Sequence, residues 1–183
     1  MKIVVAATGA SGAIYTQRLL DHLAGHEVHF ISTGHARAVQ ALELPGGLQV
    51  PAGVIRYEEN GSMQVPFVSG SARFDAMVVI PASMGTIGRV AHGVSDTTIA
   101  RAADVFLKER RTLIFVPREA PYNLIHLRNM AALTEAGATI IPASPSFYSQ
   151  PATLGALVDT VIARVLDHLG LRHSLSKRWL DAD

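Results

Sequence analysis

Five short, continuous apolar runs constrain the fold of this chain more than any other feature. They are Ile3–Ala7, Val28–Ser32, Ala76–Pro81, Leu113–Pro117 and Thr139–Pro142. Uninterrupted Val, Ile and Ala runs of this length are typical of parallel strands buried on both faces, because a half-exposed strand would alternate apolar with polar residues. Segments with helical periodicity separate the runs and follow the last one: Gly12–Ala24, His35–Leu42, Thr97–Arg110, Tyr122–Ala136 and Thr153–Leu169. The alternation predicts an α/β fold built on a doubly wound parallel sheet.

The length and the spacing of these segments predict a single domain. The chain has 183 residues, which fits one hydrophobic core. We expect this domain to span residues 1–171, with a polar tail over 172–183 that carries Trp179. The stretch Pro45–Arg73 is rich in Gly, Pro and Ser, so we expect a long excursion there, with one short strand near Gln64–Val68.

Charge and composition exclude several classes of function. The net charge is +1 and no Lys/Arg block occurs, so nothing points to nucleic acid. No apolar segment approaches the roughly 20 residues of a membrane span, and the N-terminus runs directly into a strand pattern without a charged leader. We therefore expect a cytoplasmic protein. The chain has no cysteine, which excludes disulfides, thiolate metal sites and a Cys nucleophile.

Two turns rich in small and hydroxyl residues follow neighbouring strands. Thr8–Ala13 follows the first apolar run, and Pro81–Thr86 follows the third. Ligands of doubly wound sheets bind beyond the carboxyl ends of the strands, where free N–H groups at helix N-termini hold anions. Taken singly, each turn is explained as well by a tight strand-to-helix connection, with Ser11 or Ser83 as a helix cap. Together they predict one phosphate or cofactor site.

The later strand ends carry charged and aromatic candidates. Arg118 and Glu119 follow the fourth run directly, so they fit either anion binding with proton transfer or a structural ion pair. Phe147 and Tyr148 follow the fifth run; core packing accounts for Phe147, whereas Tyr148 offers a hydroxyl to a phosphate. Arg164 interrupts an apolar helix face as a snorkelling side chain or an anion clamp. The histidines show no metal-ligand spacing, and we assign no metal.

Five longer motifs resemble one known family. They are TGASGAIY at 8–15, PASMGTIGRVAHG at 81–93, RAADVFLKERR at 101–111, VPREAPYNLIHLRNM at 116–130 and PASPSFYSQPATL at 142–154. In this order they resemble the flavin prenyltransferases, and the likeness runs from Ile3 to Leu171. The resemblance implies a flavodoxin-like (Rossmann-type) subunit that assembles into a homododecamer, with FMN at a junction between subunits and no metal. It also implies that the protein is an enzyme, which attaches the dimethylallyl group of dimethylallyl phosphate to reduced FMN.

The resemblance also implies a role for particular residues. The positions that match FMN contacts are Gly9, Ala10, Ser11, Ser32, Ser83, Met84, Gly85, Thr86 and Arg118. The positions that match the donor site are Tyr148 and Arg164, with Lys108 and Arg101 from a neighbouring subunit and Trp179 closing over the donor. Glu119 matches a proton-transfer residue, and Glu43 matches a carboxylate near the flavin. Taken alone, however, the segment containing Arg101 and Lys108 is typical of an ordinary solvated helix end.

Two alternatives to a prenyltransferase follow from the same features. Peptidyl-cysteine decarboxylases share the expected fold and flavin site, but they depend on a Cys acid and a Pro-Met-Asn turn, and the residues after the fourth run are Arg118-Glu119-Ala120-Pro121. A flavin carrier or accessory subunit of an aromatic-acid decarboxylase would need no second phosphate site. The product of a prenyltransferase would pass to a prenylated-FMN-dependent decarboxylase, either in ubiquinone biosynthesis or in aromatic-acid breakdown.

Overall fold

The computed structural model of the chain describes residues 1–58 and 60–175. Its centre is a six-stranded sheet in the order β3-β2-β1-β4-β5-β6, with every neighbouring pair parallel. The strands are β1 (Lys2–Ala7), β2 (Glu27–Ser32), β3 (Ile55–Tyr57), β4 (Ala76–Ala82), β5 (Thr112–Pro117) and β6 (Thr139–Ile140). This is the Rossmann-type strand order, so the prediction of a doubly wound parallel sheet in one domain is confirmed.

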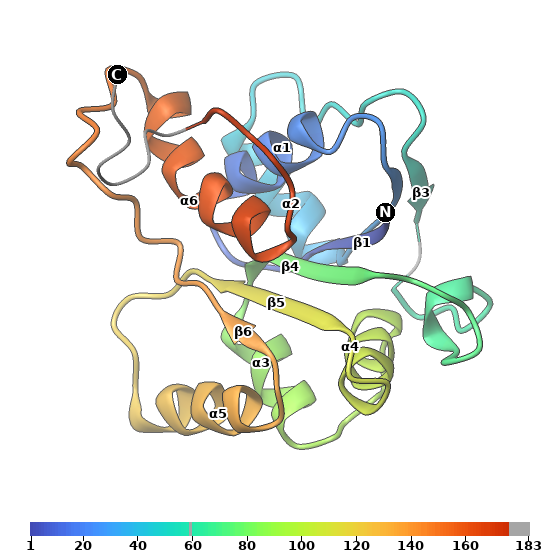
Figure 1. Ribbon diagram of the computed structural model, residues 1–183. Helices are drawn as coiled ribbons and strands as arrows, with labels where there is room; N and C mark the ends of the chain where they lie inside the picture. Colours follow the sequence, from blue (N-terminus) through green and yellow to red (C-terminus); the bar gives the residue numbers. More distant parts are fainter. Residues whose placement is uncertain (59, 176–183) are drawn as a thin grey trace.

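Helices cover both faces of the sheet (Figure 1). One layer holds α1 (Ala13–His22), α2 (Gly34–Glu43) and α6 (Leu154–His168), and the other holds α3 (Met84–Ala91), α4 (Thr98–Lys108) and α5 (Leu124–Glu135). Alternate strand residues face the two layers: Ile3 and Val5 pack with the first, and Val4 and Ala6 with the second. Because both faces of each strand pack against an apolar helix layer, the strands appear in the sequence as continuous apolar runs.

The connection between β2 and β4 differs from the sequence prediction. A strand was expected near Gln64–Val68, but the third strand of the sheet is Ile55–Tyr57, and Pro66–Val68 forms a short 3₁₀ helix. Pro66 fixes a helical φ and removes a backbone donor, which favours a helical turn over a strand at that point. The buried Phe67 of this turn packs into the second layer, so the apolar residues there fill the core without joining the sheet.

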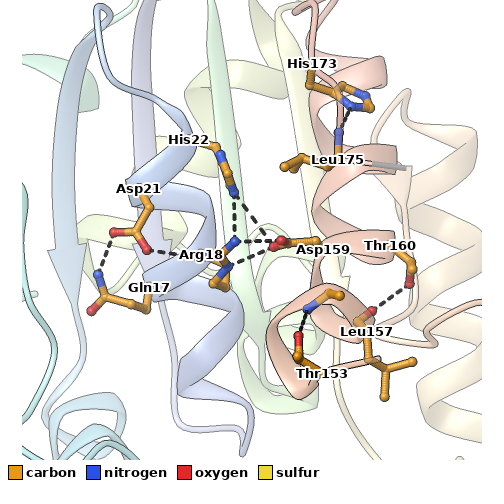
Figure 2. Close-up of polar contacts among 11 residues, drawn as sticks. Gln17, Arg18, Asp21, His22, Thr153, Leu157, Asp159, Thr160, His173 and Leu175 are labelled. Atoms are coloured by element: carbon orange, nitrogen blue, oxygen red, sulfur yellow. Dashed lines mark hydrogen bonds and ion pairs between the residues drawn. The ribbon is translucent and has the colours of Figure 1, made fainter. Parts of the chain in front are cut away.

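An ion pair joins α1 to α6 across the first layer, as Figure 2 shows. Arg18 donates from Nε to Asp159 Oδ1 at 2.8 Å and from Nη2 to Asp159 Oδ2 at 2.6 Å. The two bonds are parallel and the Asp159 carboxylate is largely buried, so the contact fixes the orientation of α6 as well as its position.

The described part of the chain contains no helix with the length and the apolar character that a membrane span requires.

Candidate functional site

A cavity of about 380 Å³ lies beyond the carboxyl ends of β1, β2 and β4. Strand order reverses direction between β1 and β4, and ligands of doubly wound sheets bind at such a switch point. Glycines and hydroxyl side chains make up much of the wall, which leaves backbone groups accessible. The lining residues are Gly9, Thr33, Gly34, His35, Asn60, Ser83, Gly85, Thr86, Arg89, Thr97 and Ile99.

Three helices begin at this cavity. Thr33 caps α2 by accepting from Ala36 N at 3.0 Å, and Thr97 caps α4 by accepting from Ala100 N at 3.2 Å. Ser83 occupies the N-cap position of α3, but its side chain caps no backbone group and instead contacts Thr86 Oγ1 at 3.1 Å. Helix N-termini carry partial positive charge, so three of them at one cavity favour an anionic ligand.

The two predicted turns are held together by one buried hydroxyl. Thr8 Oγ1 accepts from Ser83 N at 2.7 Å and donates to Pro81 O at 2.9 Å. The turn after β1 therefore lies against the turn after β4, as expected from their places at one edge of the sheet. Gly9 brings the turn after β1 equally close to the start of α2, because a Cβ added there would lie 2.6 Å from His35 Cβ. A flat group that approaches the backbone closely fits a wall of this kind.

Two backbone N–H groups at the start of α1 are already bound by a carboxylate of this chain. Glu43, the last residue of α2, accepts at Oε2 from Gly12 N at 2.8 Å and from Ala13 N at 2.7 Å. Burial alone would raise the pKa of Glu43, but hydrogen bonds from Ser11 and these N–H groups, with the positive charge of Arg118, lower the pKa below its ordinary value. Glu43 therefore stays ionised and occupies the anion position that the sequence assigned to a ligand.

Arg118 joins this cluster from the end of β5. Its Nε donates to Ser11 O at 3.2 Å, and its backbone N donates to Ala82 O at 3.3 Å. Tyr15 lies beside it: burial raises the pKa of the Tyr15 hydroxyl, and the charge of Arg118 opposes this. Glu119 is exposed and accepts from Ala120 N at 3.0 Å. Among the contacts of the described residues, no ion pair joins Arg118 to Glu119, so the alternative of a structural pair is not supported.

The donor candidates of the same chain lie at the surface. Tyr148 is 67% exposed, in the loop between β6 and α6, and Arg164 projects from α6 with 61% of its side chain exposed. Arg164 Nη1 donates to Asp167 Oδ2 at 2.8 Å. Phe147 is 69% exposed, so the prediction that it packs in the core is wrong. This loop follows the carboxyl end of β6, at the same edge of the sheet as the cavity.

Three other candidates are not brought to the cavity. Lys108 ends α4 at the opposite edge of the sheet, one β5 length or roughly 20 Å away, and is paired with Glu109. Arg101 lies in the first turn of α4 but its Nη1 bonds Asp104 Oδ2 at 2.7 Å. Trp179 lies outside the described residues.

The structure thus sorts the candidates into groups. Gly9, Ser83, Gly85 and Thr86 line the cavity. Ser11 and Arg118 belong to the Glu43 cluster beside it, and Ala10 lies in the connecting turn. Ser32 and Met84 are buried, so their side chains support the wall rather than form it.

Sequence reasoning missed Thr33, Gly34, His35, Asn60, Arg89, Thr97 and Ile99 as lining residues. The residues Thr33, Gly34 and His35 directly follow β2, so the rule that located the other two turns also identifies them. Thr97 precedes a helix as a cap, which is a readable signal. Asn60 lies in the irregular connection before β4, where no sequence pattern indicates its place.

Known proteins resemble this chain over nearly its whole length. The profile of the Flavoprotein family matches residues 1–166. The flavin prenyltransferase UbiX of Methanocaldococcus jannaschii is 44% identical over 98% of this chain and 98% of its own. A crystal structure of a dodecameric FMN-dependent UbiX-like decarboxylase from Escherichia coli O157:H7 has a TM-score of 0.90 at 38% identity, covering 99% of this chain and 100% of that one.

A second solved structure carries ligands. It is AnUbiX in complex with FMN and dimethylallyl pyrophosphate, with a TM-score of 0.89 and 37% identity, covering 100% of this chain and 98% of that one. Identity of this degree over complete chains extends the likeness beyond the fold to the family. The chain belongs to the Flavoprotein family and, within it, to the flavin prenyltransferases of the UbiX type.

Proposed function

We propose that this chain transfers the dimethylallyl group of dimethylallyl phosphate to reduced FMN and supplies the product to a prenylated-FMN-dependent decarboxylase. The observation that carries the proposal is the cavity at the switch point of the sheet, where the N-termini of α2, α3 and α4 meet. It is supported by the family and by the FMN and prenyl diphosphate bound to a relative of matching fold.

The small and hydroxyl residues that line the cavity suit FMN. Gly9, Ser83, Gly85 and Thr86 would hold it, because the glycines allow close approach and the hydroxyls and helix N-termini bind a phosphate. Arg118 would meet the flavin from the neighbouring cluster. When bound, reduced flavin would supply an electron-rich ring system. Its N5 would take the prenyl unit, which would then close a new ring at C6. Arg89 and His35 are the lining residues that the structure adds to this set.

The donor would bind on the exposed side formed by Tyr148 and Arg164. Cleavage of an allylic phosphate leaves a phosphate dianion, and fixed cationic donors stabilise that charge as it develops. Among the described residues, one subunit supplies Arg164 there, while its own Lys108 lies at the far edge of the sheet. We therefore propose a homododecamer, as found for the Escherichia coli relative, in which Lys108 and Arg101 of a neighbouring subunit complete the donor site.

Proton transfer is assigned to Glu119. Closure of the new ring requires loss of a proton, and Glu119 is a carboxylate at the ligand edge of the sheet whose side chain is exposed. Ser11 and Glu43 would act beside it by holding the turn after β1 in place, because Glu43 binds the N–H groups of Gly12 and Ala13. Trp179 is proposed to close over the donor.

The experiment is anaerobic incubation of the protein with reduced FMN and dimethylallyl phosphate, followed by mass spectrometry of the flavin. We expect flavin heavier by one five-carbon unit. Dimethylallyl pyrophosphate is run in parallel to identify the donor. Tight FMN binding without any heavier flavin from either donor would contradict the transferase and would support the carrier or accessory-subunit alternative.

A further inference from the structure

Asp167 links the donor-side arginine to the chain that follows α6. Its Oδ2 accepts from Arg164 Nη1 at 2.8 Å, and its Oδ1 contacts His173 Nε2 at 3.1 Å. The carboxylate is 22% exposed, whereas the His173 side chain is only 6% exposed. One residue of α6 therefore holds an exposed cation with one oxygen and a buried ring with the other.

The contacts of His173 determine which of its nitrogens carries the proton. Leu175 N donates to His173 Nδ1 at 3.4 Å, a contact that Figure 2 shows. Because Nδ1 accepts, Nε2 carries the hydrogen and donates to Asp167 Oδ1. Asp167 is thus held from the side opposite to Arg164 by a ring that is itself anchored to the backbone, which makes its carboxylate a fixed point and not a freely rotating surface charge.

We propose that Asp167 is a positioning residue for donor binding, a role that rests on the proposed function of Arg164. An arginine that is 61% exposed samples many rotamers, and ordering them on binding lowers affinity. Among the described contacts, the bond to Asp167 uses one of five N–H donors of Arg164 and leaves the others for a phosphate. Repulsion between Asp167 and that phosphate is reduced because two donors already share its charge.

The test measures donor binding directly, so that it does not depend on turnover. Calorimetry with dimethylallyl phosphate is carried out on the FMN-loaded protein, wild type and Asp167→Asn, together with FMN binding to each. We expect the donor Kd to rise about five- to ten-fold in Asp167→Asn, with the FMN Kd within about two-fold of wild type. The matched control is Asp21→Asn on α1, which removes another carboxylate paired with an arginine three residues away, at 3.8 Å, and is expected to change neither.

The outcomes distinguish the positioning role of Asp167 from the proposed function. An unchanged donor Kd in Asp167→Asn, or an equal loss of donor and FMN affinity, overturns the positioning role. A wild type that binds the donor but forms no product contradicts the proposed function and leaves the positioning role to be decided by the same titrations. A wild type that binds no donor overturns both. If Asp167→Asn does not fold, Asp167→Glu moves both oxygens by one methylene and is expected to raise the donor Kd about three-fold.

Discussion

The cavity and the donor side of this subunit differ in how complete they are. The cavity is formed within one chain, from three helix N-termini and the turn after β1, and Thr8 locks its two turns together. The donor side consists of Tyr148 and Arg164, both more than half exposed, and the cation that the family resemblance assigns to it, Lys108, lies at the other edge of the sheet.

The difference has a physical origin in the topology. A doubly wound sheet gathers the carboxyl ends of its strands, so turns that follow β1, β2 and β4 meet without help from other chains. Helix α4 runs from that edge back to the other, so the two ends of one helix face different sites. A residue such as Lys108 can serve a site at the carboxyl edge only by belonging to another subunit, so prenyl transfer should depend on assembly.

The largest expected effect is that of Glu119→Gln, which removes a base without touching either binding region. Because Glu119 is exposed and bonded only to its neighbour's N–H among the described contacts, the fold should be unaffected. We expect product formation to fall about 10²- to 10⁴-fold while FMN and donor still bind. Single-turnover mass spectrometry and flavin titration provide the two readouts; turnover at the wild-type rate would remove the catalytic role.

The second effect tests whether the donor side is shared between subunits. Lys108→Ala and Arg164→Ala should each lower turnover about 10²-fold, because each removes a cation from the leaving phosphate. If Lys108 acts from a neighbouring subunit, co-expression of the two variants should restore activity at roughly a quarter of the sites, those that pair an intact Lys108 with an intact Arg164. Activity no higher than that of the separate variants would contradict a donor site that is shared between subunits.

Much of the cavity could be predicted from the sequence because it follows from local rules. The turn containing Gly9 and the turn containing Ser83 each follow an apolar run directly, and the sheet topology then places them together. The strand at Ile55–Tyr57 could not be found in this way: it has three residues, none of them buried, and lies in an irregular connection. Its place depends on pairing with β2, which is a tertiary contact.

The donor side could be predicted only through the family resemblance. Nothing in the pattern around Arg101 and Lys108 distinguishes them from a solvated helix end, and within one subunit both are in fact paired with nearby acids. The role of Glu43 was also only partly accessible, since its bonds to Gly12 and Ala13 span some thirty residues of sequence. Contacts between distant segments, and between subunits, produce no periodic pattern in a single sequence, so they cannot be predicted from it.

A third effect concerns the cavity wall. Gly9→Ala would place a Cβ 2.6 Å from His35 Cβ, so the start of α2 must shift away from the turn after β1. We expect FMN affinity to fall about ten-fold, with a loss of stability of about 1–3 kcal/mol from the overpacked contact. Gly155→Ala in α6 is the matched control, because its added Cβ meets Thr153 at an ordinary 3.9 Å. Equal effects of the two substitutions on FMN titration would contradict the close approach at Gly9.

The smallest effect is on stability and comes from Glu43→Gln. The variant keeps the shape of the side chain but loses the charge that faces the start of α1, so we expect a destabilisation of at most about 1 kcal/mol near neutral pH. The folded pKa of Glu43 is lowered from its ordinary 4.5, so its stabilising contribution is present above that value and is lost as the pH falls through the folded pKa. The difference in Tm between wild type and Glu43→Gln should therefore shrink on acidification below 4.5. Glu58→Gln, which removes an exposed carboxylate paired with Arg56, controls for the general loss of surface charge. A Tm difference that stays constant across this range would show that the ionised carboxylate does not hold the turn that borders the cavity.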